Sequence, residues 1–171
     1  MSSLIVFETE RTNVRYLQTS DAAFILKLLN SEGWLKNIGD RKVYDIPAAE
    51  IYLKDRVIFD YPNGFGLYGI ELKETGELVG TTGLIDRPGL DGIDVGFAML
   101  DDQAGKGYGY EATFPVIGHA RNLGIKKLLA ITLPSNLSSR KLLEKLGFSL
   151  EKEFYMDGDP ELLCLYTQEL K

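Results

Sequence analysis

Alternating apolar and polar residues, interrupted by helical patterns, predict one mixed sheet with helices on both faces. Strand-like segments are expected at residues 11–18, 65–72, 77–85, 91–100, 127–134, 148–156 and 161–170. Helical patterns are expected at residues 22–30, 48–59, 110–124 and 135–148. The strands between residues 65 and 100 follow one another directly, whereas the next ones alternate with helices. The order therefore predicts an α/β (α+β) fold.

The segment 91–100 carries different residues on its two faces. Alternate positions hold large apolar side chains, which we assign to the core: Ile93, Val95, Phe97 and Met99. The opposite face places the carboxylate of Asp94 beside Gly96 and Ala98. Because the two neighbours are very small, we expect space next to Asp94 for a group that is not part of the protein.

Composition restricts the class of protein. With 171 residues, 44% of them hydrophobic, the chain is expected to form one domain over residues 1–171. No apolar run approaches the roughly 20 residues that span a bilayer, so we expect a cytoplasmic protein without a membrane partner. The single cysteine, Cys164, has no second thiol for a disulfide or a metal site. A net charge of -6 argues against a nucleic-acid partner.

Residues 103–112, QAGKGYGYEA, join a predicted strand to a predicted helix. Gly105, Gly107 and Gly109 allow consecutive backbone N–H groups to converge on one point, and the helix behind them adds about half a positive charge. Lys106 can add to that charge. The pattern favours an anion-binding loop, with an ordinary tight loop as the alternative.

Two better-known phosphate loops do not fit this segment. The Walker pattern requires Ser or Thr after Gly-Lys, and Gly107 follows Lys106 here. The dinucleotide-binding fingerprint opens a parallel strand-helix-strand unit, whereas this loop follows a series of predicted antiparallel strands. A protein that uses the loop to bind ATP is therefore disfavoured.

The loop resembles the signature of the GNAT superfamily of acetyl-CoA-dependent N-acetyltransferases, in particular the branch with the ribosomal-protein N-terminal acetyltransferases. That signature is Arg or Gln, two variable residues, Gly, a variable residue, and Gly or Ala. The segment AGKGYG matches it except at Ala104, with Gln103 one residue early. Further resemblance, in the family's order, lies at residues 10–15, 76–84, 94–99 and 136–148.

The resemblance implies the GNAT fold, a single, mixed, mostly antiparallel sheet of six to seven strands with a splayed central parallel pair. The splayed strands would contain Asp94 and Leu129, and the pantetheine arm of acetyl-CoA would lie between them. No metal is implied. The implied cofactor-binding residues are Met99, Leu100, Gly105, Lys106, Gly107, Tyr108, Gly109, Asn136 and Arg140.

Two of these residues also have simple structural interpretations. Asn136 is as well suited to cap the following helix as to bind the cofactor, and Ser135 competes with it for the cap. Arg140, like its neighbour Lys141, fits a solvated surface position as well as a phosphate ligand.

The implied reaction moves an acetyl group from acetyl-CoA to a primary amine by direct attack in a ternary complex. It requires a neutral amine and a proton for the departing thiolate. Asp94 stands where the resemblance places a catalytic base, acting through water, and a structural acid at the strand start is the alternative. Asp86 and Glu111 are weaker candidates, since Glu111 suits the helix N-terminus.

The catalytic acid departs from the commonest family pattern. Many members carry a Tyr at the position of Leu143, so that role is vacant here. The branch resemblance offers Ser139, whose hydroxyl can donate a hydrogen bond to the thiolate; an ordinary first-turn serine is the alternative. His119 lies in the middle of a predicted helix, and we expect a structural role for it.

The acceptor is the least patterned part of the prediction. The resemblance makes the segment with Trp34 and Tyr44 one wall of the acceptor site, although core packing explains both aromatics equally well. A protein N-terminus or a small-molecule amine is expected as partner, and a homodimer is compatible with the family. The alternative function is a non-catalytic module that binds or senses CoA or acyl-CoA, which Ala104 and Leu143 favour.

Overall fold

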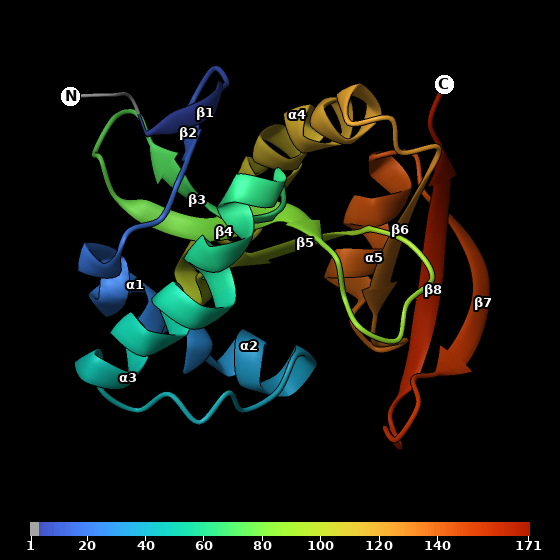
Figure 1. Ribbon diagram of the computed structural model, residues 1–171, viewed down its shortest axis with the longest axis horizontal. Helices are drawn as coiled ribbons and strands as arrows, with labels where there is room; N and C mark the ends of the chain where they lie inside the picture. Colours follow the sequence, from blue (N-terminus) through green and yellow to red (C-terminus); the bar gives the residue numbers. More distant parts are fainter. Residues whose placement is uncertain (1–3) are drawn as a thin grey trace.

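A computed structural model describes residues 4–171 as one sheet with helices on both faces (Figure 1). The strand order is β1-β2-β3-β4-β5-β6-β8-β7. The strands are β1 (Ile5–Glu8), β2 (Thr12–Arg15), β3 (Gly66–Leu72), β4 (Leu78–Ile85), β5 (Asp94–Met99), β6 (Lys127–Thr132), β7 (Ser149–Tyr155) and β8 (Leu162–Glu169). The α-helices are α1 (Ala22–Leu29), α2 (Glu32–Asn37), α3 (Ile46–Tyr52), α4 (Tyr108–Asn122) and α5 (Leu137–Lys145).

The mostly antiparallel sheet with one central parallel pair is confirmed, but it has eight strands rather than six or seven. The additional strand is β1, which pairs antiparallel with β2 across a tight turn in which the Thr9 N–H donates to the Thr12 carbonyl at 2.9 Å. Four residues are too short a run for alternation to identify, so the sequence pattern missed β1.

Two helical details also differ from expectation. The helix α2 was not expected; Ser31 caps it by accepting a hydrogen bond from the Trp34 N–H at 3.4 Å. The helix expected at residues 48–59 begins earlier, where Asp45 caps α3. It then changes after Tyr52 into a π-helical turn and a 3-10 segment that includes Pro62. Proline has no N–H to continue an α-helical ladder, which agrees with this ending.

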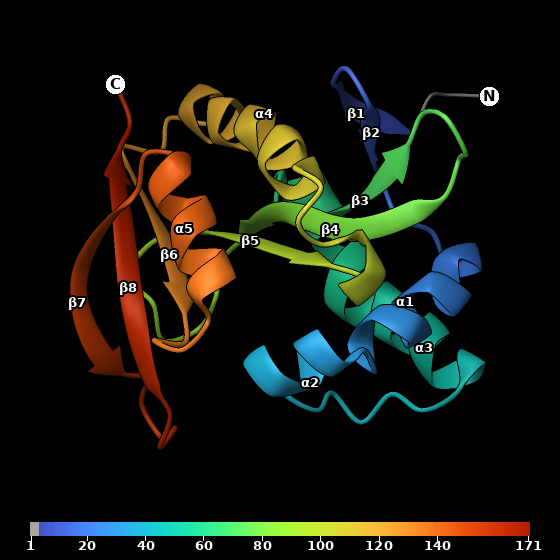
Figure 2. The ribbon, with the colours of Figure 1, turned by 180° about the vertical axis from the view of Figure 1, so that it is seen from behind.

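The central parallel strands touch only where they begin. Their register contains one pair, Asp94 with Leu129, and the Leu129 N–H donates to the Ile93 carbonyl at 2.9 Å. On its other edge, β5 pairs with β4 over its whole length. The two halves of the sheet therefore separate beyond Asp94, as Figure 2 shows from the side of α4 and α5. This is the splayed pair that the sequence resemblance implied.

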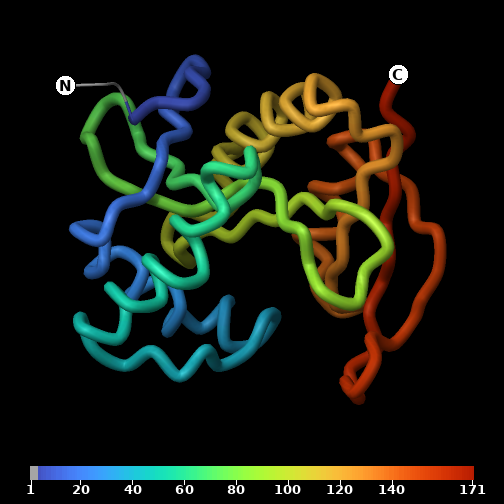
Figure 3. Tube along the Cα trace, in the orientation of Figure 1, coloured from blue at the N-terminus to red at the C-terminus, as the bar shows by residue number. Residues whose placement is uncertain are grey.

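The loop between β4 and β5, residues 86–93, reaches from the first half of the sheet to the second (Figure 3). There Gly92 lies against the side chain of Leu129, and Gly89 lies against Met156. The crossing matters for the site because the loop carries Arg87, which contacts Asp94.

Apolar clusters on the two faces of the sheet hold the helices in place. One cluster joins α4 and α5 to the sheet and includes Val95, Val116 and Leu143. A second lies beneath α1–α3 and includes Leu100. A buried hydroxyl pair, Thr82 and Thr113 at 2.8 Å, adds a polar link between β4 and α4. The strand β5 is thus fixed from both sides.

Two glycines offer a matched test of this packing. A Cβ at Gly83 would overlap the carbonyl oxygen of Gly66 on the paired strand, whereas a Cβ at Gly118 in α4 would meet nothing within 4 Å. We expect Gly83→Ala to lower the free energy of unfolding by about 2 kcal/mol through overpacking. We expect Gly118→Ala to raise it by about 0.5 kcal/mol because alanine favours the helix. Urea unfolding measures both, and equal effects would refute the assigned β3–β4 register.

Candidate active site

The glycine loop leaves its backbone donors free at the start of α4. Gly105 and Gly107 have φ of +78° and +86°, a region that side chains other than hydrogen disfavour. Gly107 is the N-cap residue, and no side chain within residues 4–171 caps the helix. The first N–H groups of a helix lack intrahelical acceptors, and the partial positive charge of the helix adds to them. The loop can therefore hold an anion with backbone atoms.

Of the other loop residues, Gly109 allows close packing and Lys106 carries a positive charge. Gly109 is buried, and a Cβ there would lie 3.3 Å from Leu142 and 3.8 Å from Met99, so this glycine allows α4 to approach α5 and β5. The Lys106 ammonium is exposed and donates to the Gln103 side chain at 3.3 Å. Tyr108 is half-buried. Gly105 and Gly107 thus set the backbone conformation of the loop, whereas Gly109 serves packing.

Sequence reasoning missed a set of contacts behind this loop. The Arg11 Nε donates to Glu111 Oε1 at 2.8 Å, and Arg11 Nη1 donates to the Lys106 carbonyl at 3.0 Å. The Thr9 hydroxyl donates to Glu111 Oε2 at 2.5 Å. The only available signal was the resemblance of residues 10–15, which did not show where Arg11 would point.

These contacts make Glu111 a poor catalytic base. Partial burial acts to raise the pKa of Glu111, but the hydrogen bonds from Thr9 and from the backbone and side chain of Arg11 outweigh it and lower that pKa. A carboxylate that accepts strong hydrogen bonds takes up a proton reluctantly. The weaker role considered for Glu111 in catalysis therefore has no support, and its position at the helix N-terminus is structural.

Asp94 lies at the point where β5 and β6 separate, and its side chain is only 1% exposed. Arg87 contacts both carboxylate oxygens, at 3.4 Å from Nε to Oδ1 and 3.2 Å from Nη2 to Oδ2. Burial raises the pKa of Asp94 to about 6, against the opposing effect of the Arg87 charge. A carboxylate with this pKa can accept a proton near neutral pH.

Part of the space expected beside Asp94 is occupied by apolar side chains of the protein. A Cβ on Gly96 would lie 2.8 Å from Ile85 Cδ1 and 3.5 Å from Leu67 Cδ2. Farther along the same face, Ala98 and Leu100 join the cluster beneath α1–α3. The small residues thus make room for neighbouring apolar groups, which a strand pattern alone does not show, and space next to Asp94 for a group outside the protein stays a prediction.

The start of α5 brings three predicted site residues together. Asn136 caps the helix, since its side-chain oxygen accepts from the Ser139 N–H at 3.3 Å. The guanidinium of Arg140 donates to the Tyr166 hydroxyl and to the Pro134 carbonyl, both at 2.9 Å. Ser139 is half-buried in the first turn. Asn136 and Arg140 thus have structural roles in this arrangement, and their contacts with a cofactor stay predictions.

The predicted acceptor residues lie in different environments. Trp34 is 7% exposed in the cluster beneath α1–α3, and within residues 4–171 its indole N–H has no hydrogen-bond partner. Tyr44 is exposed and donates to Asp40 at 2.6 Å. For Trp34 this favours the core alternative. His119, expected to be structural, contacts the Gly64 carbonyl at 3.1 Å and the ring of Phe7.

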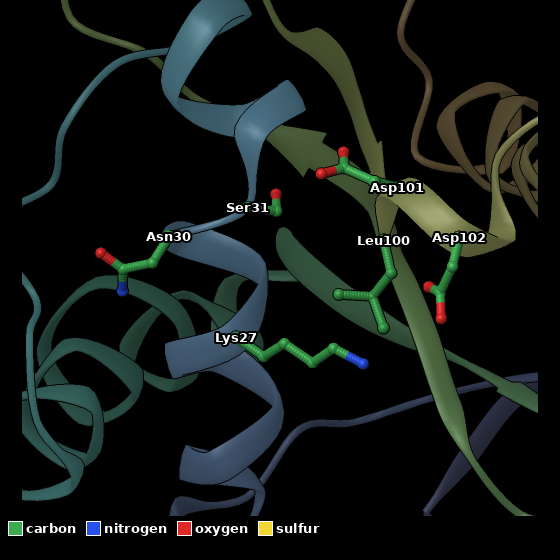
Figure 4. A pocket seen from close by; sticks show the side chains of 6 residues that line it. All are labelled: Lys27, Asn30, Ser31, Leu100, Asp101 and Asp102. Carbon is green, nitrogen blue, oxygen red and sulfur yellow. The ribbon is translucent and has the colours of Figure 1, made fainter.

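A cavity of about 300 Å³ lies between the end of α1 and the end of β5 (Figure 4). Lys27 extends along it toward Leu100, and Asn30 turns away to donate to the carbonyls of Leu26 and Val43. On the opposite wall, Asp101 accepts from the Gly33 N–H at 3.1 Å. The lining residues are Lys27, Asn30, Ser31, Leu100, Asp101 and Asp102. The cavity thus adjoins the segment that leads into the glycine loop.

Within residues 4–171, no group of three or more His, Cys, Asp or Glu side chains is placed to hold a metal ion. No helix in this range has the length and apolar character needed to span a membrane.

Comparison with known sequences points to one family. Residues 11–149 match the family described as "Acetyltransferase (GNAT) domain". The uncharacterized N-acetyltransferase YjdG of Bacillus subtilis (strain 168) is 38% identical over 89 residues, 51% of this chain and 53% of YjdG. This match therefore spans about half the length of that relative. The uncharacterized N-acetyltransferase YoaA of the same organism is 24% identical over 171 residues, with 95% of each chain covered.

Comparison with solved structures agrees with the sequence match. An acetyltransferase from Agrobacterium tumefaciens is 25% identical, with a TM-score of 0.80 over 99% of this chain and 96% of that one. RimL, the ribosomal L7/L12 α-N-protein acetyltransferase in complex with coenzyme A, is 16% identical, with a TM-score of 0.82 over 97% and 98% of the two chains. The second likeness shows the fold. Taken with the family match over most of its length, these findings show that the chain belongs to the GNAT family of acetyltransferases.

Proposed function

We propose that the protein transfers the acetyl group of acetyl-CoA to a primary amine by direct attack in a ternary complex. The observation that carries this proposal is the opening of the sheet at Asp94. The chain then leads from the end of β5 into a glycine loop with free backbone donors at the start of α4. The solved neighbour RimL holds coenzyme A, which supports the same ligand class here.

The arrangement suggests how acetyl-CoA is held. The loop around Gly105 and Gly107 offers N–H groups to the diphosphate. The edge of β5 that faces β6 has no ladder beyond Asp94, so its backbone can pair with the amide groups of the pantetheine arm, near Met99 and Leu100. The thioester supplies the activated acetyl carbon, and the chain supplies orientation and proton transfer.

Asp94 is the proposed base for the incoming amine. Attack on the thioester carbonyl requires the nitrogen lone pair, so the ammonium must first lose a proton. Because Asp94 is almost fully buried, it takes this proton through an intervening water, and Arg87 fixes the carboxylate. Ser139 donates a hydrogen bond to the sulfur as the carbon–sulfur bond breaks, which stabilises the departing thiolate. The thiolate then takes up the proton that the nitrogen releases as the amide forms.

The family and the solved neighbours support a primary amine as acceptor. RimL is named as an acetyltransferase of a protein α-amino group, which supports a protein N-terminus. A small-molecule amine fits the same chemistry, and the cavity between Lys27 and Asp101 lies at the end of β5. We therefore propose a primary amine of either kind, approaching from the side of α1 and α2.

One observation favours a second function, a non-catalytic module that binds CoA. Leu143 stands where many relatives are expected to carry the acidic Tyr, and it is buried in the core at 1% exposure. The two functions differ in turnover. Only an enzyme releases free thiol from acetyl-CoA when amines are added.

The decisive measurement is thiol release from acetyl-CoA with a panel of peptide and small-molecule amines. We expect turnover with at least one amine, and a decrease in kcat of about 100-fold for Asp94→Asn, because a general base contributes about that much. Ser139→Ala should lower kcat by about tenfold, through the loss of one hydrogen bond to the sulfur. Coenzyme A binding without any turnover would instead establish the non-catalytic module.

The pH profile tests the base more directly. Since Asp94 must be ionised to accept a proton and burial raises its pKa to about 6, kcat/KM should rise with pH through a limb near that value. The Arg87 charge lowers the pKa of Asp94, so Arg87→Met should move this limb upward by about 1 pH unit. A limb that does not move in this variant would show that another group is the base.

Asp94 should also lower the free energy of unfolding at neutral pH. Its pKa rises from an ordinary 3.8 to about 6 on folding, so the native state binds the proton more tightly than the unfolded state. Stability is therefore lost as pH rises from about 4 to 6, by about 3 kcal/mol at most. Asp94→Asn should unfold at higher urea than the wild type at pH 7.5 and lose most of this advantage at pH 4. A variant less stable at pH 7.5 would contradict the assigned burial.

A further inference from the structure

The glycine loop is held from behind by a segment far away in sequence. The turn between β1 and β2 carries Thr9 and Arg11, and both reach α4 and the loop before it. The separation from Arg11 to Lys106 is 95 residues. This contact therefore belongs to the tertiary structure and is absent from the loop motif.

Arg11 closes a ring of hydrogen bonds around Gly107. Its Nη1 donates to the carbonyl that precedes Gly107, that of Lys106, at 3.0 Å. The carbonyl of Gly107 itself accepts from the Glu111 N–H at 3.1 Å. The Glu111 carboxylate then accepts from both the backbone N–H and the Nε of Arg11, each at 2.8 Å. The peptide units on both sides of Gly107 are thus held by one pair of residues, through the Arg11 side chain on one side and the Glu111 backbone N–H on the other.

The ring determines where the N–H of Gly107 points. None of the described residues has a cis peptide bond, so the Lys106 carbonyl and the Gly107 N–H, which share one peptide unit, point in opposite directions. Because Arg11 holds the carbonyl, the N–H faces away from the guanidinium. No acceptor for this N–H is found within residues 4–171, so it is free for a ligand on the other side of the loop.

The contact with Arg11 also explains why position 107 is a glycine. A Cβ on Gly107 would lie 3.1 Å from Arg11 Nη2, and the φ of +86° is strained for any side chain. The guanidinium further lies over the Tyr108 ring, at 4.5 Å from its centre. The loop is therefore fitted closely around Arg11 on this side.

We propose that Arg11, with Glu111, is a positioning residue that orients the Gly107 N–H toward the diphosphate of acetyl-CoA. The inference rests on the proposed function, because it needs a diphosphate on the far side of the loop. Arg11 acts through the peptide unit and not as a direct ligand. Its loss should weaken only ligands that carry the diphosphate, since the pantetheine arm is held by β5.

The test compares two thioesters in two matched variants. Each of the variants Arg11→Met and Arg121→Met removes one exposed positive charge. Arg11 lies beside the first turn of α4, whereas Arg121 lies in its last turn and makes no described side-chain contact. We expect Arg11→Met to raise KM for acetyl-CoA and the dissociation constant of CoA by about tenfold, with a smaller change in kcat. The kcat/KM for acetyl-pantetheine, which lacks the diphosphate, should stay within about twofold. Arg121→Met should behave as the wild type with both thioesters.

A conservative variant separates orientation from charge. Arg11→Lys keeps the charge but cannot donate to the Lys106 carbonyl and Glu111 in the same fork, so we expect it to bind CoA as weakly as Arg11→Met. Full binding by Arg11→Lys would show that charge alone matters and would overturn the proposal. An equal loss with both thioesters would also overturn it, because that indicates general damage to the fold.

The outcomes distinguish the inference from the function on which it rests. If the wild-type protein shows no affinity for CoA in calorimetry, both fail together. If the wild type binds CoA and Arg11→Met binds it equally well, the proposed function stands and the role of Arg11 is refuted. Thermal unfolding of each variant checks the fold, and a native-like transition is expected because Arg11 is about half exposed, at 45%.

Discussion

The site depends on one interrupted ladder of backbone hydrogen bonds. The strands β5 and β6 pair at Asp94 and Leu129 and nowhere further, while β4 holds the other edge of β5 along its full length. Unpaired backbone groups inside a protein are costly unless a partner satisfies them. A ligand with its own amide groups is such a partner, so the opening in the sheet is itself a reason to expect an extended, amide-containing cofactor.

Helices pack against both faces of the sheet around this opening. The helix α4 packs on one face through Val116 and the buried Thr82–Thr113 pair, and the cluster beneath α1–α3 covers the other face. The loop of residues 86–93 bridges the two halves of the sheet and brings Arg87 to Asp94. A gap with a buried carboxyl group of raised pKa at its narrow end suits acyl transfer, because it can orient reactants before the reaction begins.

The two carboxyl groups near the site, those of Asp94 and Glu111, have pKa values shifted in opposite directions. Asp94 is buried with one partly exposed arginine, and its pKa is raised to about 6. Glu111 receives several hydrogen bonds and has a lowered pKa. Of these two carboxylates, that of Asp94 is suited to proton transfer, and that of Glu111 is suited to accepting hydrogen bonds from the backbone and side chain of Arg11. This division comes from burial and hydrogen bonding, since both side chains bear the same chemical group.

The sequence alone determined the family, most strands, the glycine loop before α4 and the position of Asp94. These follow from local patterns, namely alternation, glycine positions and a motif that leads into a helix. Only the tertiary structure decided that Gly109 serves packing, that protein fills the space beside Gly96, and that Asn136 caps a helix. It also brought Arg11 to the loop from 95 residues away. Such contacts depend on how separate elements meet in space, and the pattern within one element carries no information about what packs against it.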